Sequence, residues 1–423
     1  MEKTKNQPEF RQITVMILMT VFQSFCALSV ILREEEINLS FIYIFGGYIL
    51  AEWLFMLFGV IITGNDYFEL EAIAFFLSGI GLTVCATLGE NYAFKQVVAI
   101  GIGLAVYLLI LILIRNVNIA SALRYPAAVG SVLLLIVNIA LAKTTNGTLN
   151  WIDLGGFSIQ PSEFVKVAFI LVGAVSLQKL VSTVSLTKYI IFSLSCVGLL
   201  FIIKDFGAAL IFFFTFILIA YMRSGDVRTI VLICTVALMG ALLIIWFKPY
   251  VADRFAAYRH VWENSDTTGY QQTRVLIYSA SGGLFGLGLG EGKLRNIFAA
   301  STDLVFGLIC EEMGLIIGFS IILAFACIAV FAVRASRGAA STFYAIAAVS
   351  AAGMLLFQLA LNVFGITDLL PLTGVTLPFV SRGGSSVICS WGLLAYIRAA
   401  GAPFRLPGPD VAISKQTQRR RVQ

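Results

Sequence analysis

The sequence contains few charged residues for its length. Asp, Glu, Lys and Arg make up 12% of the 423 residues, and 59% are hydrophobic, whereas soluble globular proteins average about 25% charged residues. The mean hydropathy is +0.93. A water-soluble core could not hide this much apolar surface. The composition therefore excludes a soluble globular protein and indicates a chain embedded mostly in a lipid bilayer.

The sequence also lacks the cysteine and histidine patterns of metal-binding or disulfide-rich proteins. All seven cysteines lie in apolar stretches and none forms a CxxC pair, so we expect small buried hydrophobic residues. His260 is the single histidine. It could serve as a base, but its place in a loop with interfacial character favours solvation or packing at the membrane surface.

Long hydrophobic runs dominate the chain. A transmembrane helix needs about 20 predominantly apolar residues. The first run follows MEKTKNQPEFRQ and is too long for a signal peptide, so we expect a membrane helix and no cleavable signal. The Pro- and Gly-rich stretch 365–381 is predicted to re-enter the membrane between two helices. The runs together predict an all-α polytopic membrane protein with about 12 transmembrane helices, near residues 12–32, 40–62, 70–88, 95–114, 125–142, 164–180, 188–203, 206–222, 228–247, 304–333, 341–364 and 382–399.

The distribution of Lys and Arg sets the orientation. Cytoplasmic loops are enriched in these residues, and a cytoplasmic N-terminus places most of the 29 basic residues in the cytoplasm. Both termini are then cytoplasmic, and one long loop, residues 248–302, is extracellular. The polar tail, residues 401–423, ends in RRRVQ, which predicts a disordered cytoplasmic segment.

Several charged residues lie inside or at the ends of the predicted helices. Charge within a bilayer is costly, so each of these residues is a functional candidate. The alternative is mutual pairing that holds the helices together, and Glu163 and Lys166, three residues apart, suit such a pair. These residues are Glu52, Glu163, Lys166, Lys204, Asp205, Glu311, Glu312 and Arg382.

The long loop opens with VADRFAAYRHVWEN, in which apolar and aromatic residues recur at helical spacing from Val251 to Trp262. Arg254 and Arg259 lie off that stripe. This pattern predicts a helix on the outer leaflet, with its cations near lipid headgroups or an anionic lipid-linked substrate. The glycine-rich run GYQQTRVLIYSASGGLFGLGLGEG follows, and no βαβ unit surrounds it, which excludes a nucleotide loop. Close backbone packing or a bent segment is expected there.

The loop closes with AASTDLVFGLICEEMG. Ser301 or Thr302 is predicted to cap the next helix and to place Asp303 in its first turn. The helix dipole favours an ionised carboxylate at that position. The local pattern therefore leaves two roles open for Asp303, support of the helix start or chemistry.

Five segments together resemble the SEDS family (shape, elongation, division and sporulation; FtsW/RodA/SpoVE) of membrane peptidoglycan polymerases. They follow the family's order and cover roughly residues 70–400. The resemblance implies a ten-helix core in 69–400, preceded by an extension of two helices in 1–68. The family's Pro-Glu before the Thr-Asp pair is replaced here by RNIFAASTD. The segments are NWIDLGGFSIQPSEFVKV, KDFGAAL, GYQQTRVLIYSASGGLFGLGLGEG, TDLVFGLICEEMGLIIG and LPLTGVTLPFVSRGGSS.

The resemblance implies glycosyl transfer that polymerises lipid II at the outer face of the bacterial cytoplasmic membrane, in cell division or cell-shape maintenance. Asp303 matches the family's loop aspartate, and we assign it as the general base for an attacking sugar hydroxyl. An α-linked donor that gives a β-linked polymer implies inversion at the anomeric carbon, so we expect a single displacement. Among the cations that could hold the pyrophosphate, the family motif implies Lys166, whereas the others rest on charge and topology. The substrate-binding candidates are Glu163, Lys166, Asp205, Arg254, Arg259, Arg274, Glu311, Arg382 and Ser385.

The resemblance also implies partners. These are lipid II, a class B penicillin-binding protein with transpeptidase activity, and membrane lipids; no nucleic acid is expected. A divalent cation, Mg²⁺ or Mn²⁺, could share the charge of the pyrophosphate, although no ligand cluster in the sequence demands one. The rival function is a lipid II flippase. A flippase should concentrate charge at the bilayer midplane, near Glu52, Asp205 and Glu311, and a polymerase in the loop before Asp303.

Overall fold

The structure is a computed structural model. It describes residues 9–33, 38–63, 68–142, 150–153, 158–178, 183–228, 231, 233–235 and 258–401. The predicted helix at 228–247 falls largely outside these residues, as do Arg254 and the tail from 402 onward. The described residues contain nine helices that are long and apolar enough to cross a membrane. The prediction of an all-α polytopic membrane protein is therefore confirmed.

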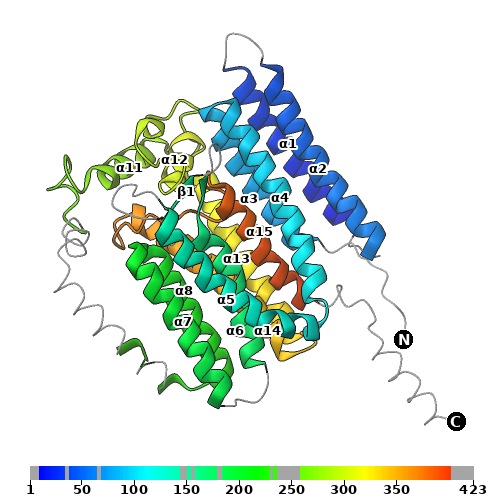
Figure 1. The fold of residues 1–423 in the computed structure, drawn as a ribbon. Helices are drawn as coiled ribbons and strands as arrows, with labels where there is room; N and C mark the ends of the chain where they lie inside the picture. Colours follow the sequence, from blue (N-terminus) through cyan, green and yellow to red (C-terminus); the bar gives the residue numbers. More distant parts are fainter. Residues whose placement is uncertain are drawn as a thin grey trace.

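Helices α3, α13 and α15 lie near the middle of the bundle, with α1 and α2 along one flank and α7 and α8 along the other (Figure 1). Two short strands, β1 (Ile152–Asp153) and β2 (Ser158–Ile159), pair antiparallel before α6. The helices are α1 (Glu9–Ile31), α2 (Leu39–Thr63), α3 (Glu69–Leu88), α4 (Glu90–Ile114), α5 (Val117–Leu141), α6 (Pro161–Leu177), α7 (Thr183–Ile203), α8 (Phe206–Ser224), α11 (Tyr270–Ser281), η1 (Leu294–Asn296), α12 (Val305–Glu312), α13 (Leu315–Arg337), α14 (Thr342–Ile366) and α15 (Gly384–Ala400).

The centre of the bundle is built around Trp391 of α15, which is fully buried. Its indole meets the rings of Phe75, Tyr107 and Phe379 edge-on, at centroid distances of 5.0, 5.9 and 5.9 Å. Such edge-to-face contacts add to the stabilisation from apolar burial. Gly103 of α4 lies against this indole, where a Cβ would approach the ring to 2.9 Å. The small residue lets α4 and α15 pack closely.

Helices α1 and α2 lie side by side along one flank of the bundle (Figure 1). The Nε2 of Gln23 donates a 2.8 Å hydrogen bond to the buried carboxylate of Glu52, and the Nε1 of Trp53 donates to the Thr20 hydroxyl at 2.9 Å. A Cβ on Gly79 of α3 would lie 3.3 Å from Gln23. The polar partner of Glu52, which the sequence did not reveal, thus joins the two helices against the core.

A buried ion pair joins α3 to the last turn of α15. The Nε of Arg398 lies 3.1 Å from the Glu71 carboxylate, and both side chains are at 0% exposure. The Tyr107 hydroxyl also donates to Glu71, and the Arg398 guanidinium lies 5.1 Å from the centre of the Phe68 ring. Helix α15 extends to Ala400 and carries Arg398 inside the bundle.

The helix predicted at 304–333 is two helices, α12 and α13, and the single-helix prediction was wrong. Gly314 separates them with a φ of 87°. Residues 282–292, which we name the glycine-rich turn, lie against this break. Leu287 and Gly288 of the turn donate their N–H groups to the carbonyls of Glu311 and Glu312 at 2.9 and 3.1 Å. These bonds satisfy carbonyls that a continuous helix would have used internally.

Two further expectations changed. Helix α5 begins at Val117 rather than near 125, because the Asn116 side chain accepts a hydrogen bond from the N–H of Asn118 and starts the helix earlier. The outer-leaflet helix predicted from Val251 to Trp262 lies outside the described residues up to 257. Its described part is not helical, since Arg259 has a φ of 62°.

The segment predicted to re-enter the membrane lies inside the bundle over its second half, residues 375–381. It is non-helical from Thr367 to Gly383, and we name these residues the re-entrant segment. Leu377, Phe379 and Val380 are at 0% exposure.

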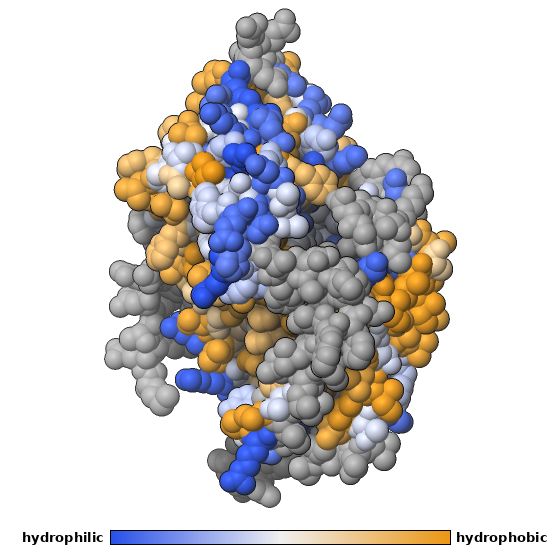
Figure 2. Space-filling model, turned by 90° about the vertical axis from the view of Figure 1, so that its left-hand side faces the viewer, coloured by the Kyte–Doolittle hydropathy of each residue, from blue (hydrophilic) through white to orange (hydrophobic). Residues whose placement is uncertain are grey.

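Hydrophilic residues gather on the upper part of the face shown in Figure 2, with hydrophobic residues flanking them. The bundle therefore presents an apolar surface suited to lipid.

Candidate functional site

Asp303 lies in a tight turn that precedes α12. The N–H groups of Thr302, Asp303 and Leu304 all donate to the carbonyl of Ala299, which has a φ of 63°. Helix α12 begins at Val305, and its N-cap, Leu304, makes no side-chain cap. The prediction that Asp303 lies in the first helical turn under a Ser301 or Thr302 cap was therefore wrong.

The carboxyl group of Asp303 is unusually basic. Burial raises its pKa to about 7, against the opposing effect of a hydrogen bond with Thr302, and the nearby Asp205 carboxylate raises it further. Desolvation and a like charge both disfavour the ionised form of an acid. At neutral pH the group is close to half ionised, which suits a residue that takes up a proton during a reaction.

The re-entrant segment holds the Asp303 turn on one side. The Ser381 hydroxyl donates to the carbonyl of Thr302 at 2.6 Å, and the N–H of Arg382 donates to the carbonyl of Ser301 at 2.8 Å. A Cβ on Gly374 would lie 3.3 Å from the Asp303 carboxylate. Gly374 has a φ of 70°, a conformation that glycine adopts without strain, and it leaves space beside the acid.

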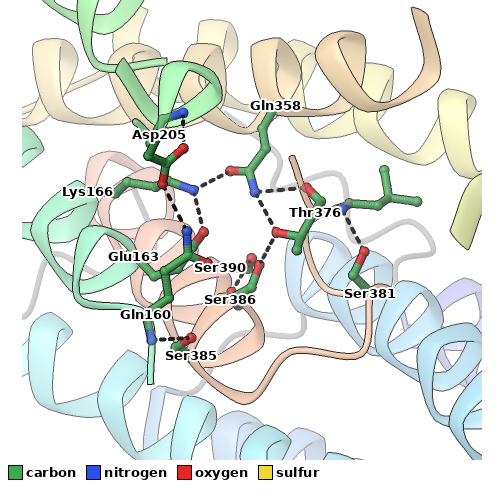
Figure 3. Close-up of polar contacts among 12 residues, drawn as sticks. Gln160, Glu163, Lys166, Asp205, Gln358, Thr376, Ser381, Ser385, Ser386 and Ser390 are labelled. Carbon is green, nitrogen blue, oxygen red and sulfur yellow. Dashed lines mark hydrogen bonds and ion pairs between the residues drawn. The ribbon is translucent and has the colours of Figure 1, made fainter. Parts of the chain in front are cut away.

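The same segment contacts the start of α8 on its other side. A Cβ on Gly207 would overlap Val375 and lie 3.0 Å from the carbonyl of Thr373. Asp205 caps α8 by accepting the N–H of Ala208 at 3.0 Å, and its second oxygen accepts the side-chain amide of Gln160 at 3.2 Å (Figure 3). The re-entrant segment therefore lies between the two aspartates.

Lys166 begins a chain of polar contacts that reaches the re-entrant segment (Figure 3). Its ammonium is 2.8 Å from Glu163 and 3.1 Å from the side-chain oxygen of Gln358. The amide of Gln358 donates to the carbonyl of Thr376 at 2.9 Å, and the Thr376 hydroxyl is 2.9 Å from that of Ser386. Glu163 and Lys166 are thus a buried pair, as their spacing suggested, and they also belong to the site.

Ser385 and Lys204 lie at the edges of this network. The Ser385 hydroxyl accepts the N–H of Gln160 at 3.4 Å. Lys204 precedes Asp205 with a φ of 67° and an exposed side chain. The structure brings together Glu163, Lys166, Asp205, Ser385 and, through the re-entrant segment, Asp303.

The predicted outer cations are more dispersed. The guanidinium of Arg382 lies 4.8 Å from the centre of the Tyr92 ring, that of Arg274 5.2 Å from Tyr270, and that of Arg259 5.8 Å from Tyr258. Of these three arginines, Arg382 is the one whose main-chain N–H donates a hydrogen bond to the Asp303 turn. Among the described residues, none of the three side chains forms an ion pair with an acid of the site.

Glu311 organises the glycine-rich turn. It is fully buried, and its two oxygens accept the N–H groups of Lys293 and Leu294 at 2.7 and 2.9 Å. A Cβ on Gly292 would lie 2.7 Å from one of these oxygens. The carboxylate therefore holds the end of the loop against α12, one helix away from Asp303.

Sequence reasoning missed several polar residues of the site. Gln358 and Asn362 lie four residues apart in an otherwise apolar helix, so they share one face, and this signal was available in the sequence. Asn362 donates to the carbonyls of Asp303 and Val375, both at 2.8 Å. Thr376 and Ser381 gave no comparable signal, because their contacts come from distant parts of the chain.

The site can supply a base, a buried cation and ordered hydrogen-bond donors. No group of three His, Cys, Asp or Glu side chains that could hold a metal ion occurs within the described ranges. Asp205 and Asp303, on either side of the re-entrant segment, are acids of the site that could contribute ligands. Participation of Mg²⁺ or Mn²⁺ stays a prediction.

Known proteins resemble this chain over most of its length. Stage V sporulation protein E of Bacillus subtilis is 32% identical over 263 residues, which is 60% of this chain and 71% of that protein. Peptidoglycan glycosyltransferase RodA of Mycobacterium tuberculosis is 30% identical over 284 residues, which is 63% of this chain and 61% of that protein. The match thus spans less than two thirds of the mycobacterial relative.

Solved structures share the fold. One, described as structural coordination of polymerization and crosslinking by a peptidoglycan synthase complex, has a TM-score of 0.66 at 23% identity and covers 78% of this chain and 95% of that chain. The rod shape determining protein RodA of Thermus thermophilus has a TM-score of 0.59 at 23% identity, covering 79% and 97%. Residues 75–401 match the FtsW/RodA/SpoVE family of cell cycle proteins. The chain therefore belongs to this family, as its motifs predicted.

Proposed function

We propose that this protein is a peptidoglycan glycosyltransferase that polymerises lipid II into glycan strands at the outer face of the bacterial cytoplasmic membrane. The mycobacterial relative carries the name peptidoglycan glycosyltransferase. The observation that carries the proposal is the position of Asp303. It carries a half-buried carboxyl group whose pKa is raised to about 7, and the re-entrant segment connects it to the Lys166 network.

Asp303 acts as the general base. Its carboxylate takes the proton from a sugar hydroxyl while that oxygen bonds to the anomeric carbon of the donor. The bond from this carbon to the pyrophosphate breaks at the same time, and the polyprenyl pyrophosphate leaves with the electron pair. An α-linked donor gives a β-linked product, so one displacement inverts the anomeric centre. The leaving group departs well without a proton, which explains why one base is enough.

The cations stabilise the pyrophosphate as negative charge develops. Lys166 uses two acceptors, Glu163 and Gln358, and an ammonium has three donors. The third N–H of the Lys166 ammonium is then the one that can donate to a pyrophosphate oxygen of the substrate. Arg382 serves at the rim, where its main chain is bonded to the Asp303 turn.

The proposal extends to location and partners. The Asp303 side of the bundle faces outward, as the Lys and Arg distribution predicts. A class B penicillin-binding protein would cross-link the new strand. The fold shared with a complex that coordinates polymerization and crosslinking supports this partnership. Division and cell-shape maintenance are the two processes that such a pair would serve.

A flippase is the less favoured function. It would need free charge near the middle of the bundle. Glu52 is bonded to Gln23, and Glu311 to two main-chain N–H groups, so both acids make structural contacts. Asp303, the acid assigned as the base, lies instead in the turn that ends the long loop, just before α12.

The test compares Asp303→Asn with wild type, using purified protein and lipid II. We expect polymer formation to fall by about 100-fold or more. Asp266→Asn is the matched control, because Asp266 is an exposed acid of the same loop, and it should polymerise normally. Undiminished polymer from Asp303→Asn would refute the base assignment. Lipid translocation, scored separately in vesicles, would support the flippase if it persisted without any polymer.

A further inference from the structure

The bundle contains a second polar feature at the far end of α6 from the candidate site. A pocket of about 230 Å³ opens between α5, α6 and α7. Ser176 of α6 lines it, ten residues after Lys166, so this wall of the pocket lies about 15 Å along the helix from Lys166. At the orientation given by the basic residues, it lies at the cytoplasmic membrane surface.

Two cations flank this pocket and share one aromatic ring. The guanidinium of Arg124 lies 4.3 Å from the centre of the Tyr125 ring, and the ammonium of Lys188 lies 5.5 Å from it and 3.5 Å from the Tyr125 hydroxyl. Tyr125 thus holds both cations at the same rim. Neither cation pairs with a carboxylate in the part of the chain that the structure describes, and the Nε of Arg124 is buried there with no hydrogen-bond partner. Two uncompensated cations at one rim favour an anionic ligand.

The inner wall of the pocket is apolar and aromatic. Tyr189, at 1% exposure, and Phe192 form part of it. Outside the pocket, the helices present large exposed hydrophobic side chains, with Val129 59% exposed on α5 and Leu194 67% exposed on α7. In a membrane protein such residues face acyl chains. The surroundings are those of a lipid rather than of a soluble anion.

We propose that this pocket, bounded by Arg124, Tyr125, Lys188 and Tyr189, binds the phosphate headgroup of an anionic glycerophospholipid from the cytoplasmic leaflet. Arg124 and Lys188 bind the phosphate oxygens, and the acyl chains lie against the exposed apolar residues of α5 and α7. Basic pockets between transmembrane helices at this membrane face are suited to acidic headgroups. A pocket of about 230 Å³ leaves room for a phosphate headgroup while the chains stay outside.

This site is independent of the polymerase chemistry. It shares α6 with the Lys166 network, but the two use opposite ends of the helix. A bound lipid would bridge α5 and α7, which both contact α6. The ligand is therefore expected to stabilise the helices that position Glu163 and Lys166 without touching the substrate.

The test uses the full chain, purified in detergent and offered equimolar phosphatidylglycerol and phosphatidylcholine with the same acyl chains. Native mass spectrometry measures the ratio of the two bound lipids. Wild type should prefer phosphatidylglycerol. In Arg124→Gln/Lys188→Gln, the ratio of bound phosphatidylglycerol to bound phosphatidylcholine should fall about fivefold for each cation removed. Arg334→Gln/Arg337→Gln, which removes two cations from the last turn of α13, is the matched control and should bind as wild type does.

A second variant separates charge from folding. Ser176→Leu fills the pocket wall and keeps both cations, so it should also lose the preference, and it decides the question alone if the double variant does not fold. Wild-type preference in Arg124→Gln/Lys188→Gln or in Ser176→Leu would overturn the proposal. Displacement of phosphatidylglycerol by excess inorganic phosphate would also overturn it, because the site would then take a soluble anion.

Discussion

The side-chain amide of Asn362 donates a 2.8 Å hydrogen bond to the carbonyl oxygen of Asp303. The same nitrogen donates to the carbonyl of Val375, also at 2.8 Å. One amide of α14 therefore fixes the Asp303 turn relative to the re-entrant segment. Asn362 is a positioning residue, since it acts on the base through the main chain.

Replacement of Asn362 by Leu should lower the rate of lipid II polymerisation at saturating substrate by roughly tenfold or more, because small displacements of a base slow catalysis strongly. The two released carbonyls should cost about 1–3 kcal/mol each in the free energy of unfolding. Asn138→Leu is the matched control, as Asn138 is a buried Asn of α5, away from the site. Equal losses in kcat for the two variants would show that Asn362 has no special relation to Asp303.

The raised pKa of Asp303 predicts a pH dependence. The base must be ionised, so polymerisation should rise with pH and reach its half-maximum near the pKa of about 7. The same shift makes the folded state bind this proton more tightly than the unfolded chain does. Asp303 therefore costs stability as pH rises from about 4 to 7. Asp303→Asn should melt at a higher temperature than wild type at pH 8, with a difference that shrinks toward pH 4. A flat rate profile from pH 5 to 8 would contradict the assignment.

The Glu163–Lys166 pair predicts a separation of stability from activity. Lys166→Met leaves the Glu163 carboxylate buried without its cation, which costs about 3–5 kcal/mol in the free energy of unfolding. Adding Glu163→Gln should restore the melting temperature, because the unpaired charge is gone. Polymerisation should stay low in this double variant, since the ammonium is still missing. If full activity returns with stability, Lys166 is only a structural counterion.

The N-terminal helix pair touches the glycine-rich turn through Arg33. Its Nε lies 3.5 Å from the Glu291 carboxylate, and a Cβ on Gly290 would overlap its guanidinium. Gly290→Ala should therefore separate the two segments and lower the melting temperature. Gly283→Ala is the control, because Gly283 also has a positive φ of 56° but faces open space.

A double-mutant cycle checks this contact. In an Arg33→Ala background, the cost of Gly290→Ala should shrink to that of Gly283→Ala, about 1–2 kcal/mol of backbone strain. Thermal unfolding of the four proteins measures the coupling. If the cost of Gly290→Ala is the same with and without Arg33, the two helices do not support the turn.

Much of the fold could be predicted because apolar runs of about 20 residues leave few alternatives in a membrane. The pairing of Glu163 with Lys166 followed from their spacing alone. The break between α12 and α13 could not be predicted in this way, because the hydrogen bonds that stabilise it come from Leu287 and Gly288, outside the run.

The candidate site was only partly predictable for the same reason. Asp303 was found by its motif, but its basicity depends on burial and on Asp205, 98 positions earlier in the chain. Asn362 binds it across 59 positions. Arg398 of α15 pairs with Glu71, which lies at the start of α3. Such long-range pairs are set by tertiary packing, which local patterns do not encode.

The burial of Trp391 makes it an optical reporter inside the fold. Its indole touches Phe379 of the re-entrant segment, so its fluorescence is sensitive to any shift of that segment. Replacing the other four of the five tryptophans by Phe would leave one emission signal from the centre of the bundle. The arrival of substrate near Asp303 could then be followed in real time, without attaching a dye to the protein.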